Sequence, residues 1–504
     1  MSSTAIPELA PAPIPEPVVA GLERKIASGA AWAFLAVLAE RLVAFAVFVL
    51  VVRHLAPSDV GVVTLAGVFV DLTLILTQGG LPEAIVRHPS PRPETFNTAF
   101  WVNIAIATAM TTGLCLLSVP IAAIYAAPVL VPVLCVLSGS FLLTALGAVH
   151  QARLNRGLRF RALSARSMAA TLIGGGAALA LSESGHGIWA LVAQRLVALA
   201  VSTISLWMAT RWVPGISIDR TEMRALLGFG AKLSVGNLLL QLTSSVSLLI
   251  IGAAMSSAAV GYYRVAYRLY DVVNQFLVSP LSQVALAGLS AVQTDRLRFT
   301  TLYARMTSMV SVVAIAAFFG LAVLAAPAIR VIFGVDWAAS APILSILCLL
   351  GVPVCVNVFV WPALVARGAA GEVFRFSVVQ LVTSVAFSLV AAPFGAAAVA
   401  IAQVVRAFSV LPYALLLTSR HVGIDARVVL QRLLPPTLAA ICMAGSLYLL
   451  NRGIPNGSSA MRILLVNIPI GIVLYSGFMM IFAKRQLREV FRMLRRMREK
   501  PLML

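Results

Sequence analysis

The run Ala99-Phe-Trp-Val-Asn-Ile-Ala-Ile-Ala-Thr-Ala-Met-Thr-Thr-Gly-Leu-Cys-Leu-Leu-Ser-Val119 contains no charged side chain. A helix needs roughly 20 mostly apolar residues to cross the hydrocarbon core of a bilayer, and this run has that length. The runs Met306–Ala325 and Ile463–Phe482 have the same character. Strands of a membrane barrel would instead alternate apolar and polar residues over about ten positions. The runs therefore predict membrane-spanning helices in an all-α polytopic membrane protein.

The composition extends this prediction to the whole chain of 504 residues. Hydrophobic residues make up 60% and charged residues 11%, whereas soluble domains have roughly 45–50% and 25%. The net charge of +20 does not indicate nucleic-acid binding, because the Lys and Arg residues recur in alternate loops rather than on one exposed patch. The five cysteines lie in apolar runs without metal-ligand spacing, so no disulfide framework and no metal site are expected.

Short polar or Gly/Pro segments divide the apolar sequence into about fourteen expected spans. The bilayer is the solvent for these segments, and only helices satisfy every backbone polar group there within one segment. The expected spans start near Ala30, Asp59, Thr98, Pro128, Ala162, Gly187, Gly228, Ala258, Leu302, Ala339, Phe376, Ala396, Leu434 and Ile463.

Basic residues in the connections predict the orientation of the chain. In inner-membrane proteins the cytoplasmic loops carry an excess of Lys and Arg. With a cytoplasmic N-terminus, the dense basic segments such as residues 153–166 and the C-terminal tail all fall inside, and the outside connections hold only Arg53, Arg330, Arg452 and Arg462. We expect both termini in the cytoplasm and the protein in the bacterial inner membrane.

An internal duplication links residues about 200 positions apart. Ala56-Pro-Ser-Asp-Val-Gly61 aligns with Ser256-Ser-Ala-Ala-Val-Gly261, and the pair Ala193-Gln194 has a counterpart in Ala402-Gln403. Each repeat contains six spans, an even number, so both repeats enter the membrane in the same direction. Two parallel six-helix lobes followed by two added helices are typical of a transporter in which the lobes rock against each other.

The repeat predicts the organisation of the chain. We expect a disordered cytoplasmic tail (residues 1–27), an N-terminal six-helix lobe (28–210), a cytoplasmic linker (211–227), a C-terminal six-helix lobe (228–420), two additional transmembrane helices (421–484) and a basic amphipathic cytoplasmic tail (485–504).

Several charged residues lie within the expected spans, where a lipid-facing charge costs about 2.5–3.5 kcal/mol. They are therefore expected to face one another or a water-filled cavity. Cations outnumber acids among them, so a shared cavity would favour an anionic ligand such as a phosphate or pyrophosphate, for which Arg offers forked donors. These residues are Glu40, Arg41, Asp71, Arg195, Lys232, Arg264, Arg268, Asp271 and Arg406.

The eighth expected span is the most polar helix of the chain. Arg264, Arg268 and Asp271 fall at positions i, i+4 and i+7, which places them along one helical stripe. The candidate substrate-binding residues are Arg41, Arg264, Arg268, Arg406, Tyr267, Asn237 and Gln241. The candidates for ion coupling, or alternatively for structural ion pairs between helices, are Glu40, Asp71, Asp271 and Lys232. Lys232 and Arg195 are expected nearest the membrane faces, where long side chains can snorkel.

Nothing in the sequence indicates an enzyme. It lacks the Gly-x-x-x-x-Gly-Lys-Ser/Thr loop of nucleotide hydrolases, and its connections are too short to hold a catalytic domain. The five histidines are scattered without ligand spacing. We expect neither catalysis nor a cofactor.

Several motifs carry a family resemblance, which is dense over the first 215 residues. Val52-Arg-His-Leu-Ala-Pro-Ser-Asp-Val-Gly61, Gly79-Gly-Leu-Pro-Glu-Ala-Ile-Val-Arg87 and Phe96-Asn-Thr-Ala-Phe-Trp101 are three of them. Two more are Arg153-Leu-Asn-Arg-Gly-Leu-Arg-Phe-Arg161 and Gly187-Ile-Trp-Ala-Leu-Val-Ala-Gln194. Together they resemble the polysaccharide transporter (Wzx-like) flippases of the multidrug/oligosaccharidyl-lipid/polysaccharide exporter superfamily.

The resemblance implies a function. It implies a flippase that moves undecaprenyl-pyrophosphate-linked oligosaccharide across the inner membrane for exopolysaccharide, capsule or O-antigen synthesis, by alternating access, with polymerase and export machinery as possible partners. It assigns no ligand residue. The alternatives are an ion-coupled multidrug or lipid-precursor exporter of the same superfamily, a membrane-embedded glycosyltransferase or polymerase, and a non-transporting scaffold. An acid-dominated cavity would favour the exporter, and a long periplasmic loop would favour the enzyme.

Overall fold

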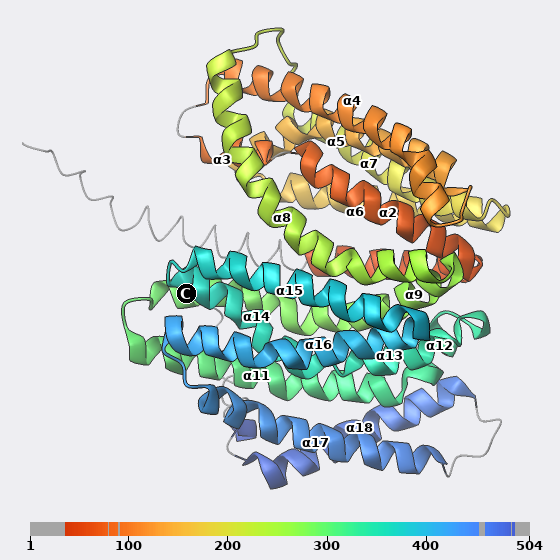
Figure 1. Cartoon of the computed structure of the whole chain (residues 1–504), viewed down its shortest axis with the longest axis vertical. Coiled ribbons are helices and arrows are strands. Elements are labelled where there is room, and N and C mark those ends of the chain that lie inside the picture. Colours follow the sequence, from red (N-terminus) through yellow and green to blue (C-terminus); the bar gives the residue numbers. More distant parts are fainter. Residues whose placement is uncertain (1–35, 79, 89–90, 453–458, 485, 489–504) are drawn as a thin grey trace, which may run out of the picture.

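The computed structural model describes residues 36–78, 80–88, 91–452, 459–484 and 486–488, and all regular secondary structure within these ranges is helical. The predicted tail at residues 1–27 lies outside the described residues, and so does the predicted tail at residues 485–504 except for residues 486–488. Two groups of helices are stacked in Figure 1, with a third, smaller group formed by α17 and α18 at the far end. The all-α membrane fold expected from the apolar runs is confirmed.

The first group forms the N-terminal lobe. Residues 36–52 are helical. The helices that follow are α2 (Pro57–Gln78), α3 (Leu81–Arg87), α4 (Pro93–Ile124), α5 (Leu130–Arg156), α6 (Phe160–Glu183) and α7 (Ile188–Thr210).

The second group forms the C-terminal lobe, and α17 and α18 pack beside it against α11. Its elements are α8 (Arg220–Ala254), α9 (Ser257–Val273), the π-helix η1 (Asn274–Val278), α10 (Ser279–Ala291), α11 (Arg296–Val323), α12 (Ala325–Ile332), the 3₁₀ turn η2 (Val335–Trp337), α13 (Ser340–Cys348), α14 (Gly351–Ala366), α15 (Ala370–Ala391), the 3₁₀ turn η3 (Ala392–Phe394), α16 (Ala396–Leu417) and the π-helix η4 (Thr418–Val422). The third group consists of α17 (Ala426–Arg452) and α18 (Ala460–Phe482).

Eleven helices of the described residues are long and apolar enough to cross a membrane. The pair α13 and α14, bent by 55°, makes a twelfth span if it is counted as one. The helix α6 also lies at an expected span, and the expected span near Ala30 begins outside the described residues. The order of helices therefore agrees with fourteen spans, although the count itself stays a prediction.

The helix α8 packs on both lobes. Its first part contacts α3 and α4, and it also packs against α15 of the C-terminal lobe. Figure 1 shows it running from the upper helices toward α9. Asp219 starts the helix by accepting hydrogen bonds from the backbone N–H groups of Thr221 and Glu222. The predicted linker 211–227 therefore ends in helix, and its extended part covers residues 211–219.

The extended part of this connection is held against α4. The side chain of Asn97 donates to Ser217 Oγ at 2.8 Å and accepts from the backbone N–H of Gly215 at 2.9 Å. The indole of Trp101 donates to the Gly215 carbonyl at 2.9 Å. The start of α8 is thus fixed to the N-terminal lobe, although α8 belongs to the second repeat by sequence.

The two repeats meet where their matching motifs cross. A Cβ on Gly61 would overlap the carbonyl oxygen of Ser257, and a Cβ on Gly261 would overlap the carbonyl oxygen of Pro57. The two contacts are each other's image under the sequence offset of the repeat, 57 with 257 and 61 with 261. Because glycine has no side chain, α2 and α9 approach closely enough for backbone contact at this point. This reciprocal contact is what a two-fold axis between parallel repeats requires.

Candidate functional site

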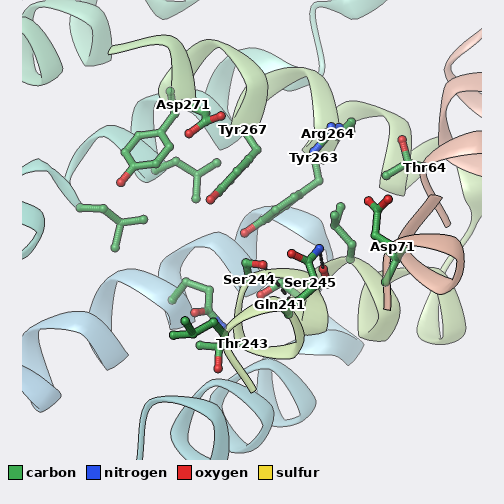
Figure 2. A pocket seen from close by; sticks show the side chains of 18 of the residues that line it. Thr64, Asp71, Gln241, Thr243, Ser244, Ser245, Tyr263, Arg264, Tyr267 and Asp271 are labelled. Atoms are coloured by element: carbon green, nitrogen blue, oxygen red, sulfur yellow. Dashed lines mark hydrogen bonds between the residues drawn. The ribbon is translucent and has the colours of Figure 1, made fainter. Parts of the chain in front are cut away.

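A cavity of about 850 Å³ lies between the lobes. The residues that line it come from the first helix, α2 and α7 of the N-terminal lobe and from α8, α9, α13, α14, α15 and α16 on the other side. Figure 2 shows Tyr263 and Tyr267 of α9 pointing toward Gln241 and Ser244 of α8, with Asp71 of α2 at one side. Volumes of roughly 300–1,000 Å³ are typical of sites that bind small ligands or headgroups.

The two crossing helices line the cavity with matching positions but different side chains. On α2 these are small residues, including Thr64 and Gly67, whereas the matching positions of α9 are Arg264 and Tyr267. Asp71 and Asp271 occupy equivalent positions and both line the cavity. The cavity is therefore pseudo-symmetric in backbone and asymmetric in chemistry, with its bulky polar face on the C-terminal lobe.

On the N-terminal side, Asp71 forms an ion pair with Arg195 of α7. The distance from Arg195 Nη2 to Asp71 Oδ1 is 2.6 Å. The Arg195 side chain is 27% exposed and the Asp71 side chain 44% exposed, and both residues line the cavity. The pair therefore faces the cavity instead of lipid. Gly67 lies one turn before Asp71, and a Cβ there would meet Arg195 Nη1 at 3.8 Å, an ordinary van der Waals contact.

On the C-terminal side, Arg406 of α16 is held by two amide oxygens. Its Nε donates to Gln403 Oε1 at 2.8 Å, and its Nη1 donates to Gln380 Oε1 at 2.7 Å. Gln403 is buried and donates through Nε2 to Ser388 Oγ at 2.7 Å. Within the described residues no acidic side chain forms an ion pair with Arg406.

The charged residues of α9 differ in their surroundings. Arg264 lines the cavity and forms no ion pair or hydrogen bond with another described residue. Asp271 accepts a hydrogen bond from Gln275 Nε2 at 2.6 Å. The carbonyl of Gln275, in the π-helix η1, accepts from Arg41 Nη1 at 3.2 Å. Arg41 therefore acts as a cross-lobe donor to irregular backbone, a feature that recurs where π-helices interrupt α-helices near functional sites.

The lobes are tied together at one end of the cavity. Arg53, just after the first helix, donates from Nε to the carbonyl of Ile332 at 2.8 Å and from Nη2 to the carbonyl of Val331. These carbonyls belong to the last turn of α12, where a cation is favourable because the carbonyls there lack partners within the helix. Phe45 and Phe48 meet the ring of Phe333 edge-on at 6.4 and 6.2 Å. We refer to the contact of Arg53 with α12 as the Arg53 latch.

The chain is similar to known proteins in sequence and in fold. A family model described as "Polysaccharide biosynthesis protein" matches residues 50–342, more than half of the chain. The chain belongs to this family. The match includes α2, α7, α8 and α9, four of the helices that line the cavity. The resemblance to polysaccharide transporters noted in the sequence is thereby confirmed.

Two relatives of this family member have informative names. It is 28% identical over 333 residues to the succinoglycan biosynthesis transport protein ExoT of Rhizobium meliloti (strain 1021), which covers 66% of this chain and 67% of that protein. It is 22% identical over 359 residues to the lipopolysaccharide biosynthesis protein WzxC of Escherichia coli (strain K12), covering 71% and 73%. Both relatives are proteins of polysaccharide synthesis, and ExoT is named as a transport protein.

Solved structures share the fold. A structure of the lipid II flippase MurJ, titled as an inward closed conformation, has a TM-score of 0.70 at 14% identity and covers 90% of this chain and 99% of that one. An inward-facing transporter of the multidrug resistance MATE family has a TM-score of 0.62 at 15% identity, covering 76% and 94%. At these identities the likeness shows the fold alone.

The structure brings together six of the eleven candidate site residues. Arg264, Arg406, Tyr267, Gln241, Asp71 and Asp271 all line the cavity. Four others do not line it: Arg41 reaches η1, Glu40 lies near Arg41 and Arg166, Asn237 is exposed on α8, and Arg268 stacks over the ring of Phe48 at 5.6 Å. The side chain of Lys232 lies outside the described residues.

Two charges of the spans differ in how they meet the expectations. Arg195 faces another charge, as expected for the intramembrane charges, and takes this position instead of the alternative one at a membrane face, because it turns inward to pair with Asp71. Arg268 does not line the cavity with Arg264 and Asp271, because its guanidinium lies over the ring of Phe48 of the first helix, which itself lines the cavity. Sequence reasoning also missed the neutral residues Gln380 and Gln403 that hold Arg406. The repeat had marked Gln403, through its match with Gln194, but gave it no chemical role.

Proposed function

We propose that this protein is a flippase that moves an oligosaccharide linked to undecaprenyl pyrophosphate across the bacterial inner membrane, for synthesis of exopolysaccharide, capsule or O-antigen. The single observation that carries the proposal is the 850 Å³ cavity between two repeat-related lobes in a member of the polysaccharide biosynthesis family. Its charged lining consists of three arginines and two aspartates, Arg195, Arg264, Arg406, Asp71 and Asp271.

The chemistry of this lining suits a pyrophosphate joined to sugars. Arg264 and Arg406 form no ion pair with a carboxylate of the described residues, and planar guanidinium groups bind phosphate oxygens in pairs. Tyr263 and Tyr267 add aromatic faces with hydroxyl groups, which can pack against sugar rings and bond their hydroxyls. We infer that Asn237, exposed one turn from Gln241, meets the ligand on its way into the cavity.

The mechanism in this proposal is alternating access. With both termini in the cytoplasm, as the basic loops predict, the end closed by the Arg53 latch and by the Gly61 and Gly261 crossing would face the periplasm. The structure would then correspond to a state closed on the periplasmic side. Transport requires these contacts to break while the two lobes, residues 28–210 and 228–420, rock about the ligand. Polysaccharide polymerase and export proteins would then receive the product.

The cavity acids support one second candidate, an ion-coupled exporter of the same superfamily. Asp271 faces the cavity without an ion pair among the described residues, and such a carboxylate can carry a proton or sodium ion. The surplus of arginine favours the flippase, because a cationic drug would be repelled by it.

Deletion and complementation test the proposal. A deletion strain should lose surface polysaccharide and accumulate lipid-linked oligosaccharide in the cytoplasmic leaflet, and the wild-type gene should restore export. A gene carrying Arg264→Ala and Arg406→Ala should not restore export although the protein reaches the membrane, as measured by immunoblot of membrane fractions. Wild-type polysaccharide in the deletion strain, or full export by the double variant, would contradict the proposal or its site, respectively.

A further inference from the structure

The two halves of the cavity treat equivalent charges in opposite ways. Asp71 and Asp271 are related by the repeat, and the pair Ala193-Gln194 matches Ala402-Gln403. Gln194 is followed directly by Arg195, and Gln403 lies one turn before Arg406. All six polar members, including both glutamines, line the cavity. These six residues give each lobe one acid, one amide and one guanidinium, and the C-terminal lobe adds Arg264.

In the N-terminal lobe the acid and the guanidinium neutralise each other. Arg195 Nη2 lies 2.6 Å from Asp71 Oδ1, so the charge of this arginine is compensated within the protein. An anion entering the cavity would have to displace a carboxylate that is already in contact with the guanidinium.

In the C-terminal lobe the guanidinium of Arg406 bonds, among the described residues, only to neutral oxygens. Gln403 and Gln380 accept from Arg406 at 2.8 and 2.7 Å, and Gln403 is anchored in turn by Ser388. The hydroxyl of Ser388 also forms a hydrogen bond with that of Ser247 on α8, with an Oγ–Oγ distance of 3.3 Å. The network therefore links α8, α15 and α16. An arginine has five N–H donors, and these two bonds leave about three for a ligand.

We propose that the C-terminal half of the cavity holds the anionic headgroup, a diphosphate ester, through Arg406 of α16. Gln403 and Gln380 are the positioning residues for Arg406. The inference rests on the proposed function and adds to it the identity of the lobe and of the residues that prepare the cation. Amide oxygens fix the orientation of the guanidinium without cancelling its charge, whereas a carboxylate in the same place would do both. The N-terminal lobe, with its closed ion pair, contributes shape and not charge.

The test compares two substitutions that add the same charge to the same cavity. Gln403→Glu places a carboxylate where the 2.8 Å contact with Arg406 Nε now lies, and the matched control Gln194→Glu adds it at the repeat-related position. The measurement is the Kd of the purified full-length protein in lipid nanodiscs for undecaprenyl pyrophosphate, with undecaprenol as the uncharged probe. Inorganic pyrophosphate as competitor distinguishes recognition of the lipid from recognition of the free anion.

Gln403→Glu should weaken binding of undecaprenyl pyrophosphate about tenfold or more, because the new carboxylate would neutralise Arg406 and weaken its hydrogen bonds to the diphosphate. Hydrogen bonds between charged groups are strong enough for their loss to have an effect of this size. It should leave undecaprenol binding unchanged, which a merely structural defect would not. Gln194→Glu should change neither Kd by more than about threefold. Gln380→Glu should repeat the result of Gln403→Glu and serves in its place if that variant fails to fold.

Equal loss in Gln403→Glu and Gln194→Glu would overturn the inference, because only the net charge of the cavity would then matter. Unchanged binding in both glutamate variants of the C-terminal lobe would also overturn it. A wild-type protein that binds no undecaprenyl pyrophosphate would instead contradict the proposed function itself, so the two failures are distinct.

Discussion

Replacement of Arg53 by alanine should open the end of the molecule at which the lobes touch. The Arg53 latch consists of two hydrogen bonds from one guanidinium to the carbonyls of Val331 and Ile332. A net value of about 1 kcal/mol per bond, reduced because Arg53 is exposed, gives roughly 1.5 kcal/mol for the pair. Since 1.4 kcal/mol corresponds to a factor of ten, the population open at this end should rise about tenfold.

Thiol labelling measures this population. In a protein whose five native cysteines have been replaced, Thr64→Cys places a thiol on the cavity wall. A membrane-impermeant reagent added at the latched end should label it about tenfold faster with Arg53→Ala. Arg53→Lys, which keeps the charge and loses the fork, should lie between the two rates.

Arg330→Ala provides the control, because Arg330 also lies in the last turn of α12 and makes no hydrogen bond to another described residue. It should leave the labelling rate at the wild-type value. Labelling that is unchanged in Arg53→Ala, or raised equally by Arg330→Ala, would refute the reasoning that the two hydrogen bonds of Arg53 hold the lobes closed.

Three other substitutions test separate contacts. Gly61→Ala should disrupt the α2–α9 crossing and lower the melting temperature, whereas Gly113→Ala, where a Cβ meets nothing within 4 Å, should leave it unchanged or raise it; equal melting temperatures would contradict the crossing. Asp71→Asn should release Arg195 and tighten binding of an anionic lipid by titration; weaker binding would show that the ion pair itself is needed. Arg268→Ala should lower the free energy of unfolding by about 0.5–2 kcal/mol in denaturant titration and leave the lipid Kd unchanged. A large change in that Kd would show that Arg268 takes part in binding the lipid.

The repeat could be recognised from the sequence because its matching motifs recur in the same order about 200 positions apart. Thirteen of the fourteen expected span starts lie within or no more than two residues before a described helix, and Ala30 lies outside the described residues. The reciprocal contact of Gly61 and Gly261 could not be predicted in the same way. Sequence similarity shows that two segments are equivalent, but it does not show that they touch.

The sequence could predict members of the candidate site, but not the direction in which each side chain points. Arg264 and Asp271 are about 20° apart around a helix, and Arg268 lies about 40° to the other side of Arg264. That small rotation decides whether a side chain meets the cavity or the neighbouring first helix, and the sequence carries no record of where the neighbour is. Gln380 and Gln403 were missed because a neutral amide in a span has no insertion cost large enough to attract notice.

Reconstitution tests the central claim most directly. The purified protein is placed in liposomes with a fluorescent undecaprenyl-pyrophosphate-linked oligosaccharide from the same strain, and a membrane-impermeant quencher reports how much of the lipid has changed leaflet. The account predicts that wild-type protein exposes the initially protected lipid to the quencher, and that the Arg264→Ala and Arg406→Ala double variant does so at a rate close to that of empty liposomes. Protein-containing liposomes that match empty ones throughout would contradict it.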